Sequence, residues 1–177
     1  GRPIWLAASA APLSTSSTDA VVARLLLDTT GSTEAVRIAS LPFNLVVGNG
    51  ASASSLRNCR VYNESDLNTA LNTSSATATL FTGINSIVFS NAMILQPNTL
   101  TTVSLRCDVG DLVSGGTFTI NMNTNNVVAT GASTGLPASV TIRGAVVIPP
   151  VVVVPPVPPG LPTTGASGQA AQRVAML

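Results

Sequence analysis

The sequence predicts an all-β fold: an immunoglobulin-like or jelly-roll β-sandwich of eight to ten strands, followed by an extended Pro/Val-rich C-terminal stalk. Charged residues make up only 8% of the 177-residue chain, against roughly 25% in ordinary soluble proteins. Ser, Thr, Asn and Gly must therefore cover the surface, and these residues favour strands and turns over helices. Apolar and polar residues also alternate in short runs bounded by turn-forming residues, which is typical of half-buried strands.

Ten such runs follow one another without a helical pattern between them, which favours Greek-key or jelly-roll connections. We predict strands at residues 4–8, 20–28, 35–47, 56–62, 76–81, 86–95, 100–109, 116–122, 126–130 and 138–148. Pro42 is expected to split the run at 35–47, because proline cannot donate a hydrogen bond to a central strand ladder. The domain organisation is a sandwich domain over 1–148 with an N-terminal extended arm, a stalk over 149–160 and a tail over 161–177.

The chain has two cysteines, Cys59 and Cys107, which suit a buried thiol pair, half of a metal site or a disulfide. No His or further Cys completes a metal site. Both lie in strand-like segments, and Cys107 falls on the apolar face of its run, so we predict a disulfide. Such a bond implies an oxidising, extracytoplasmic compartment. The only Trp, Trp5, lies outside the bridged segment, so the immunoglobulin likeness is one of architecture and not of homology.

The chain contains no His, and all eight of its cations are Arg. The familiar Ser-His-Asp, Cys-His, Ser-Lys and HExxH sites are therefore excluded. A carboxylate pair remains, but the acids are scattered beside turn signals, where solvated or capping roles are usual. They are Asp19, Asp28, Glu34, Glu64, Asp66, Asp108 and Asp111. We predict no enzyme, no catalytic residue, no metal and no cofactor. With a net charge of +1 there is no basic stripe, so nucleic acid is not an expected partner.

Four polar loop tips, at residues 48–52, 63–66, 121–126 and 131–135, interrupt the predicted strands. Loops on a rigid sandwich are frequent ligand sites. Ordinary turn chemistry explains the same residues and is the preferred interpretation.

The segment 149–160 is rich in proline and valine. Proline at this density favours polyproline II, a semi-rigid spacer. Its valines are β-prone and would pair with a sheet edge. We predict that these side chains form an assembly arm: Val151, Val152, Val153, Val154 and Val157.

The next five residues are Leu161, Pro162, Thr163, Thr164 and Gly165, and they resemble the LPxTG signal of sortase-anchored bacterial surface proteins. The resemblance implies cleavage between Thr164 and Gly165 by a sortase, attachment to the cell envelope, and a location on the bacterial cell surface or cell wall. The sandwich with its disulfide also resembles small domains of such proteins. The chain departs from the family after Gly165, because residues 166–177 hold only the start of an apolar helix and no basic tail.

We therefore expect a non-enzymatic extracellular structural protein that self-assembles non-covalently into a surface fibre or layer. Covalent pilus growth and Lys-Asn isopeptide bonds are excluded because there is no Lys. The arm at 151–157 is the preferred donor strand and the run at 4–8 is the alternative, and pairing within one chain or between copies is left open. The alternative function is a monomeric wall-anchored adhesin or ligand-binding module displayed on a stalk.

Overall fold

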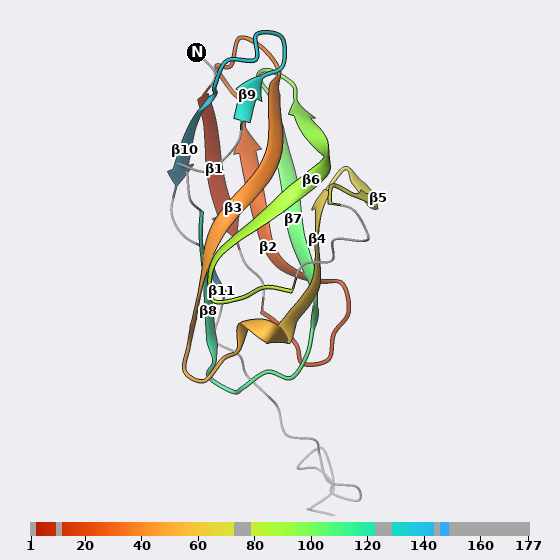
Figure 1. Ribbon diagram of the computed structural model, residues 1–177, viewed down its shortest axis with the longest axis vertical. Helices are drawn as coiled ribbons and strands as arrows, with labels where there is room; N and C mark the ends of the chain where they lie inside the picture. The colour runs from red at the N-terminus through yellow and green to blue at the C-terminus, as the bar shows by residue number, and fades with distance from the viewer. Residues whose placement is uncertain (1–2, 10–11, 73–78, 123–128, 144–145, 149–177) are drawn as a thin grey trace, which may run out of the picture.

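The computed structural model describes residues 3–9, 12–72, 79–122, 129–143 and 146–148. Two β-sheets face each other and form a sandwich that is elongated along its strands (Figure 1). The predicted all-β sandwich is confirmed. The described residues form eleven strands, and the stalk, the assembly arm and the sorting motif lie outside them.

Sheet A contains six strands in the order β10-β1-β2-β7-β4-β5. Neighbours run antiparallel, except that β1 and β10 are parallel. The strands are β1 (Pro3–Ser9), β2 (Ala20–Asp28), β4 (Leu56–Asn63), β5 (Asp66–Ala70), β7 (Leu100–Val109) and β10 (Ser139–Arg143).

Sheet B has the order β11-β8-β3-β6, and β9 also pairs with β3. All of its pairings are antiparallel. The strands are β3 (Val36–Gly48), β6 (Gly83–Leu95), β8 (Thr117–Met122), β9 (Ala129–Gly131) and β11 (Val146–Ile148). A short 3-10 helix, Ala53–Ser55, precedes β4.

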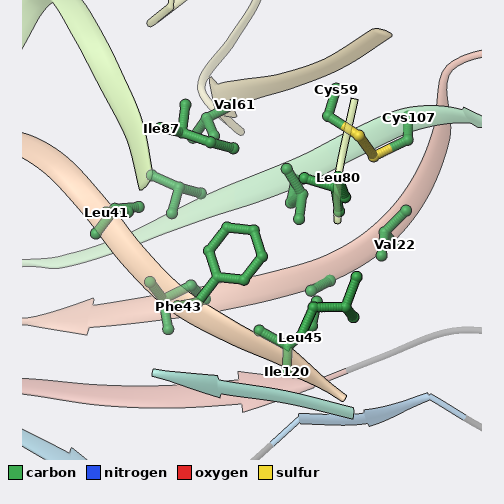
Figure 2. Close-up of a cluster of buried hydrophobic side chains, with 14 of the residues drawn as sticks. Val22, Leu41, Phe43, Leu45, Cys59, Val61, Leu80, Ile87, Cys107 and Ile120 are labelled. Atoms are coloured by element: carbon green, nitrogen blue, oxygen red, sulfur yellow. A yellow bond between two sulfur atoms is a disulfide. The ribbon is translucent and has the colours of Figure 1, made fainter. Parts of the chain in front are cut away.

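The core lies between the sheets and is built by the alternation that the sequence shows. On β7 the buried apolar side chains are Val103, Leu105, Cys107 and Val109. Figure 2 shows Phe43 of β3 pointing into the middle of the apolar cluster, with the disulfide at its border. Burying one such large apolar side chain contributes about 1.5–3 kcal/mol, so this layer dominates the stability of the domain.

The two sides of the sandwich differ. On one side the chain passes from β10, at the edge of sheet A, to β11, at the edge of sheet B, and β11 contacts β1 and β2. On the other side the edges are β5 and β6. The segment after β5 touches β6 there, since the Ser90 N–H donates to the Leu71 carbonyl oxygen at 2.9 Å.

The predicted break at Pro42 is wrong, because β3 is continuous through it. On the side away from β6, β3 pairs with β9 over Val36–Ile38 and with β8 from Phe43 onward. Pro42 falls in the interval between these two partners. A residue without an N–H is tolerated where the ladder on one side is interrupted.

Three other expectations need correction. Of the predicted strand at 76–81, residues 79–81 are not a strand, although Leu80 is buried in the core; residues 76–78 lie outside the described part. The run at 138–148 is two strands in different sheets, β10 and β11. The strand β5 was not predicted; it begins at Asp66, the last residue of the predicted loop tip at 63–66, and its residues are mostly polar and exposed.

Cys59 and Cys107 form the predicted disulfide, with Cα atoms 4.1 Å apart. It joins the neighbouring strands β4 and β7 within sheet A. Arg57 pairs with Asp108 and Arg60 with Arg106, so Asn58 and Cys59 together oppose the single residue Cys107. This two-for-one arrangement is a β-bulge, and it turns the Cys59 side chain inward, where Cys59 is fully buried.

We predict that removing the disulfide, as C59A/C107A, lowers the free energy of unfolding by about 2–4 kcal/mol, because the bond closes a long loop in the unfolded chain. Urea denaturation measures this loss, and the double variant avoids leaving a reactive thiol. Two free thiols in the native protein, counted by intact mass after alkylation without reductant, would contradict the prediction.

Candidate binding surfaces

Charged side chains gather on the outward face of sheet A. The cations come from β2, β4 and β7, and the acids from the same strands and the turns beside them. We call this set the arginine face: Arg24, Arg57, Arg60 and Arg106 with Asp19, Glu64 and Asp108. The face lies outward because Cys59, Val61, Leu105 and Cys107 take the inward positions, and side chains alternate along a strand.

Arg106 holds the centre of the arginine face. Its Nη1 lies 3.4 Å from Asp19 Oδ2, and its Nη2 lies 3.4 Å from Glu64 Oε1. Its Nε donates to Ser104 Oγ at 3.2 Å, and its guanidinium carbon lies 6.0 Å from the centroid of the Tyr62 ring. The hydrogen bond from Ser104, together with the Arg106 guanidinium, lowers the pKa of Glu64. Arg106 is therefore fully engaged within the protein.

Asp108 is the most strongly hydrogen-bonded acid of the face. It accepts from Asn58 Nδ2 at 2.8 Å and from the Asp19 backbone N–H at 3.0 Å. The hydrogen bond from Asn58 is the main cause that lowers the pKa of Asp108, followed by the Asp19 N–H and by Arg60 and Arg57. Asn58 reaches Asp108 from the bulge, where its φ is 50°. The bulge that seats the disulfide thus also positions this contact.

Arg60 contrasts with Arg106. It stands directly opposite Arg106 in the β4–β7 register, an arrangement in which like charges repel. It forms no ion pair with any described residue, and its buried Nε has no hydrogen-bond acceptor. A buried donor without a partner costs about 1–3 kcal/mol, so Arg60 differs from the other cations of this face in carrying a buried donor that the described residues do not satisfy.

Two surface hollows share Arg60 and Tyr62. One, of about 330 Å³, is lined by Asp19, Asn58, Arg60, Tyr62 and Asp108. The other, of about 270 Å³, lies between β5 and β6; we call it the β5–β6 hollow. Its lining is Arg60, Tyr62, Asn68, Thr69, Ala70, Asn72, Ser90 and Asn91.

The outward face of sheet B has a different character. Its edge strand β6 exposes Ile84 (59%), Val88 (66%) and Ile94 (47%). Among the described residues, no backbone hydrogen bond joins residues 83–89 of β6 to a segment other than β3. This stretch, which we call the β6 edge, combines a free backbone with an apolar outward row, the combination that natural edge strands usually avoid.

Several acids outside the arginine face take capping roles of the kind that the sequence suggests. Outside the arginine face, Asp28, Glu34 and Asp66 accept hydrogen bonds from backbone N–H groups of nearby turns. No three His, Cys, Asp or Glu residues of the described part come close enough to hold a metal ion. The apolar cavity beside Phe43 and Ile87 is only about 40 Å³, far below the roughly 300 Å³ of a small-molecule site.

The loop tips that are described behave as ordinary turns. In the tip at 63–66, Asn63 Oδ1 accepts from both the N–H and the Oγ of Ser65. In the tip at 131–135, the Gly135 N–H donates to the Gly131 carbonyl oxygen. The predicted assembly arm (Val151 to Val154 and Val157) and sorting motif (Leu161 to Gly165) lie outside the described residues. The arginine face was not predicted.

Within the described residues there is no helix with the length and apolarity required to cross a membrane.

Comparison with known proteins gives similarity to solved structures alone. No protein-family model and no curated protein matches the chain. Among solved structures, the chain is similar to the seventh ScaB type I cohesin from Pseudobacteroides cellulosolvens, at 12% sequence identity and a TM-score of 0.43, over 88% of this chain and 94% of that one. A similarity at this level does not place the chain in the cohesin family.

We predict that N58G raises the pKa of Asp108 toward its ordinary value, because the main hydrogen bond holding it down is lost. Glycine keeps the positive φ without strain. A lowered folded-state pKa stabilises the fold above the ordinary pKa of aspartate, and this stabilisation is lost as the pH falls through the folded value. The acid-unfolding midpoint of N58G should therefore move to higher pH.

The measurement is a carbon-13 NMR titration of the Asp108 carboxyl group, together with acid unfolding followed by circular dichroism. The matched control is N49G, which removes another asparagine with positive φ (54°) whose amide bonds the Gly115 carbonyl instead. If Asp108 titrates alike in N58G and in the wild type, the assignment of the pKa shift to Asn58 is wrong.

Proposed function

We propose that this protein is a non-catalytic module displayed on the outside of a bacterial cell, and that copies associate non-covalently when the assembly arm of one adds a strand to the β6 edge of another. The observation that carries the proposal is the β6 edge, whose backbone pairs with no described segment other than β3 and which exposes Ile84 and Val88. The arm supplies four consecutive valines, Val151 to Val154, which is the composition that strand addition favours.

Chain reach favours pairing between copies. The described chain ends with β11, at the edge of sheet B opposite to β6, and β8 and β3 lie between them. The distance across the sheet from β11 to β6 is three strand spacings of about 4.8 Å each, or about 14 Å. The three residues from Ile148 to Val151 span at most about 11 Å. The start of the arm therefore falls short of the β6 edge of its own chain, whereas a second copy imposes no such limit.

The alternative donor, the run at 4–8, is already used inside the domain. These residues belong to β1, which pairs with β10 on one side and β2 on the other. A strand with both edges occupied is not available to a neighbour. This pairing counts against the N-terminal arm as a donor.

The attachment part of the proposal rests on the sequence. Leu161 to Gly165 resembles a sorting motif, and the stalk before it would hold the sandwich away from the envelope. A sortase and an envelope amine are the partners that this resemblance implies. The lack of lysine means that the proposed assembly is non-covalent.

A monomeric wall-anchored adhesin or ligand-binding module is the second candidate function. The observation that favours it is Arg60, a cation with unused hydrogen-bonding capacity beside a hollow. The two functions differ in their association state: the first requires oligomers, and the second is complete in one chain.

We predict that deleting residues 149–160 from the full chain abolishes oligomers and leaves the sandwich folded, because the arm is removed and the core is not. V88E should have the same effect, since it places a charge in the outward row of the β6 edge. V113E is the matched control, as Val113 is also exposed (49%) but belongs to a loop.

Light scattering after size exclusion and electron microscopy measure the association state, and circular dichroism checks the fold. A deletion variant that still forms oligomers would remove the arm as donor. Oligomers of V88E equal to those of V113E would remove β6 as acceptor. A wild-type protein that stays monomeric at all concentrations would favour the adhesin.

We also predict that protein released from native cell walls by a wall hydrolase ends at Thr164 with an envelope fragment attached, and that G165A is shed into the medium. The stalk variant P158A is the matched control and should stay attached. Mass spectrometry of the C-terminal peptide is the measurement, and a wall-bound chain that continues past Gly165 would refute sortase processing.

A further inference from the structure

The β5–β6 hollow joins the two sheets at the side of the sandwich opposite to β10 and β11. Sheet A contributes Arg60 and Tyr62 from β4 and Asn68 and Thr69 from β5, while sheet B contributes Ser90 and Asn91 from β6. None of the residues that line it is acidic. The hollow is therefore a polar site with one cation, framed by amides and hydroxyls.

Asn72 fixes the strand that carries Arg60. It is 2% exposed, its Oδ1 accepts from the Val61 N–H at 2.8 Å, and its Nδ2 donates to the Cys59 carbonyl oxygen at 3.1 Å. The two residues flanking Arg60 are thus held by one buried amide, and Cys59 is also held by the disulfide. A binding group on a rigid backbone loses little entropy when a ligand arrives.

Arg60 carries a hydrogen-bond donor that has no acceptor among the described residues. Its Nε is buried and has no partner, and Arg106 opposite it already holds both Asp19 and Glu64. Asp108 lowers the local positive potential but forms no ion pair with Arg60 among the described contacts. Because the Nε is buried, an incoming carboxylate would accept from the two terminal nitrogens of the guanidinium, in the paired geometry that arginine favours, and would offset its repulsion with Arg106.

We propose that the β5–β6 hollow binds one acidic sugar unit, a uronic acid, of a polysaccharide. Arg60 takes the sugar carboxylate, and the side chains of Asn68, Thr69, Ser90 and Asn91 pair with its hydroxyls. Amides and hydroxyls both donate and accept, as sugar hydroxyls do, whereas an acidic peptide would offer few hydroxyls to them. The volume of about 270 Å³ suits a single ring.

The site is separate from the β6 edge. Ser90 already donates its N–H to Leu71, so the hollow begins where the free stretch of β6 ends. The inference therefore does not require self-association, and the two proposals fail independently.

The test titrates the full-length protein with a galacturonate oligomer, using calorimetry and NMR of the asparagine side-chain amides. In the wild type the oligomer should bind and shift the amide resonances of Asn68 and Asn91. R60Q should weaken binding at least about tenfold, since a hydrogen bond to a charged group is worth about 1.5–3 kcal/mol. R57Q, which changes an exposed arginine of the same strand that does not line the hollow, should bind like the wild type.

If R60Q does not fold, the amide shifts of the wild-type protein still show whether the oligomer binds in the β5–β6 hollow. Absence of binding, or shifts that avoid Asn68 and Asn91, would overturn the site. An equal loss of affinity in R57Q and R60Q would show that the effect comes from the general positive charge of the face and would overturn the specific role of Arg60. Equal binding of a neutral galactose oligomer would overturn the role of the carboxylate, and tighter binding of a glutamate peptide would overturn the sugar.

Discussion

The bulge on β4 is the constraint on which both faces of sheet A depend. Leu56 and Cys59 are three positions apart, so an unbroken strand would point them to opposite faces. Because Asn58 and Cys59 together oppose Cys107, both Leu56 and Cys59 turn inward and are fully buried. The same extra residue places Arg57 and Arg60 outward, on the face of Arg106. One irregularity thus serves the core, the disulfide and the charged surface.

The two sides of the sandwich differ in the binding surfaces that they carry. On the side with β10 and β11 the chain changes from one sheet to the other, and these two edge strands belong to consecutive parts of the chain. The side with β5 and β6 carries the β6 edge and the β5–β6 hollow. Both proposed modes of binding therefore fall on one side of the domain, next to each other and on different strand segments.

The sequence predicts the regular part of this fold well and the irregular part poorly. The runs at 20–28 and 100–109 have the bounds of β2 and β7, because uninterrupted alternation is a local property. Pro42, β5 and the change of sheet after Arg143 depend on which strand lies alongside, which alternation along one run does not reveal. The fate of Ile4–Ala8 as an internal strand, rather than a free arm, depends on pairing in the same way.

The disulfide was predictable and the arginine face was not, although a signal for it is present. Arg60 follows Cys59 and Arg106 precedes Cys107. If two bonded cysteines point inward from neighbouring strands, the residues beside them point outward together. Only the β4–β7 register shows that Arg60 lies opposite Arg106. Of these two arginines, Arg106 is the one that forms ion pairs, with Asp19 and Glu64. The unused donor on Arg60 is a property of that geometry and not of residue type.

The residue types of the arginine face determine how its charge responds to pH and to ionic strength. Guanidinium groups keep their proton at any physiological pH, Glu64 and Asp108 have a lowered pKa, and the chain contains neither His nor Lys. Mild acidification would therefore change the charge of this surface little. Ionic strength remains as the variable that modulates it, because screening shortens the reach of exposed charges. The electrostatic interactions of this surface therefore depend more on salt concentration than on mild changes of pH.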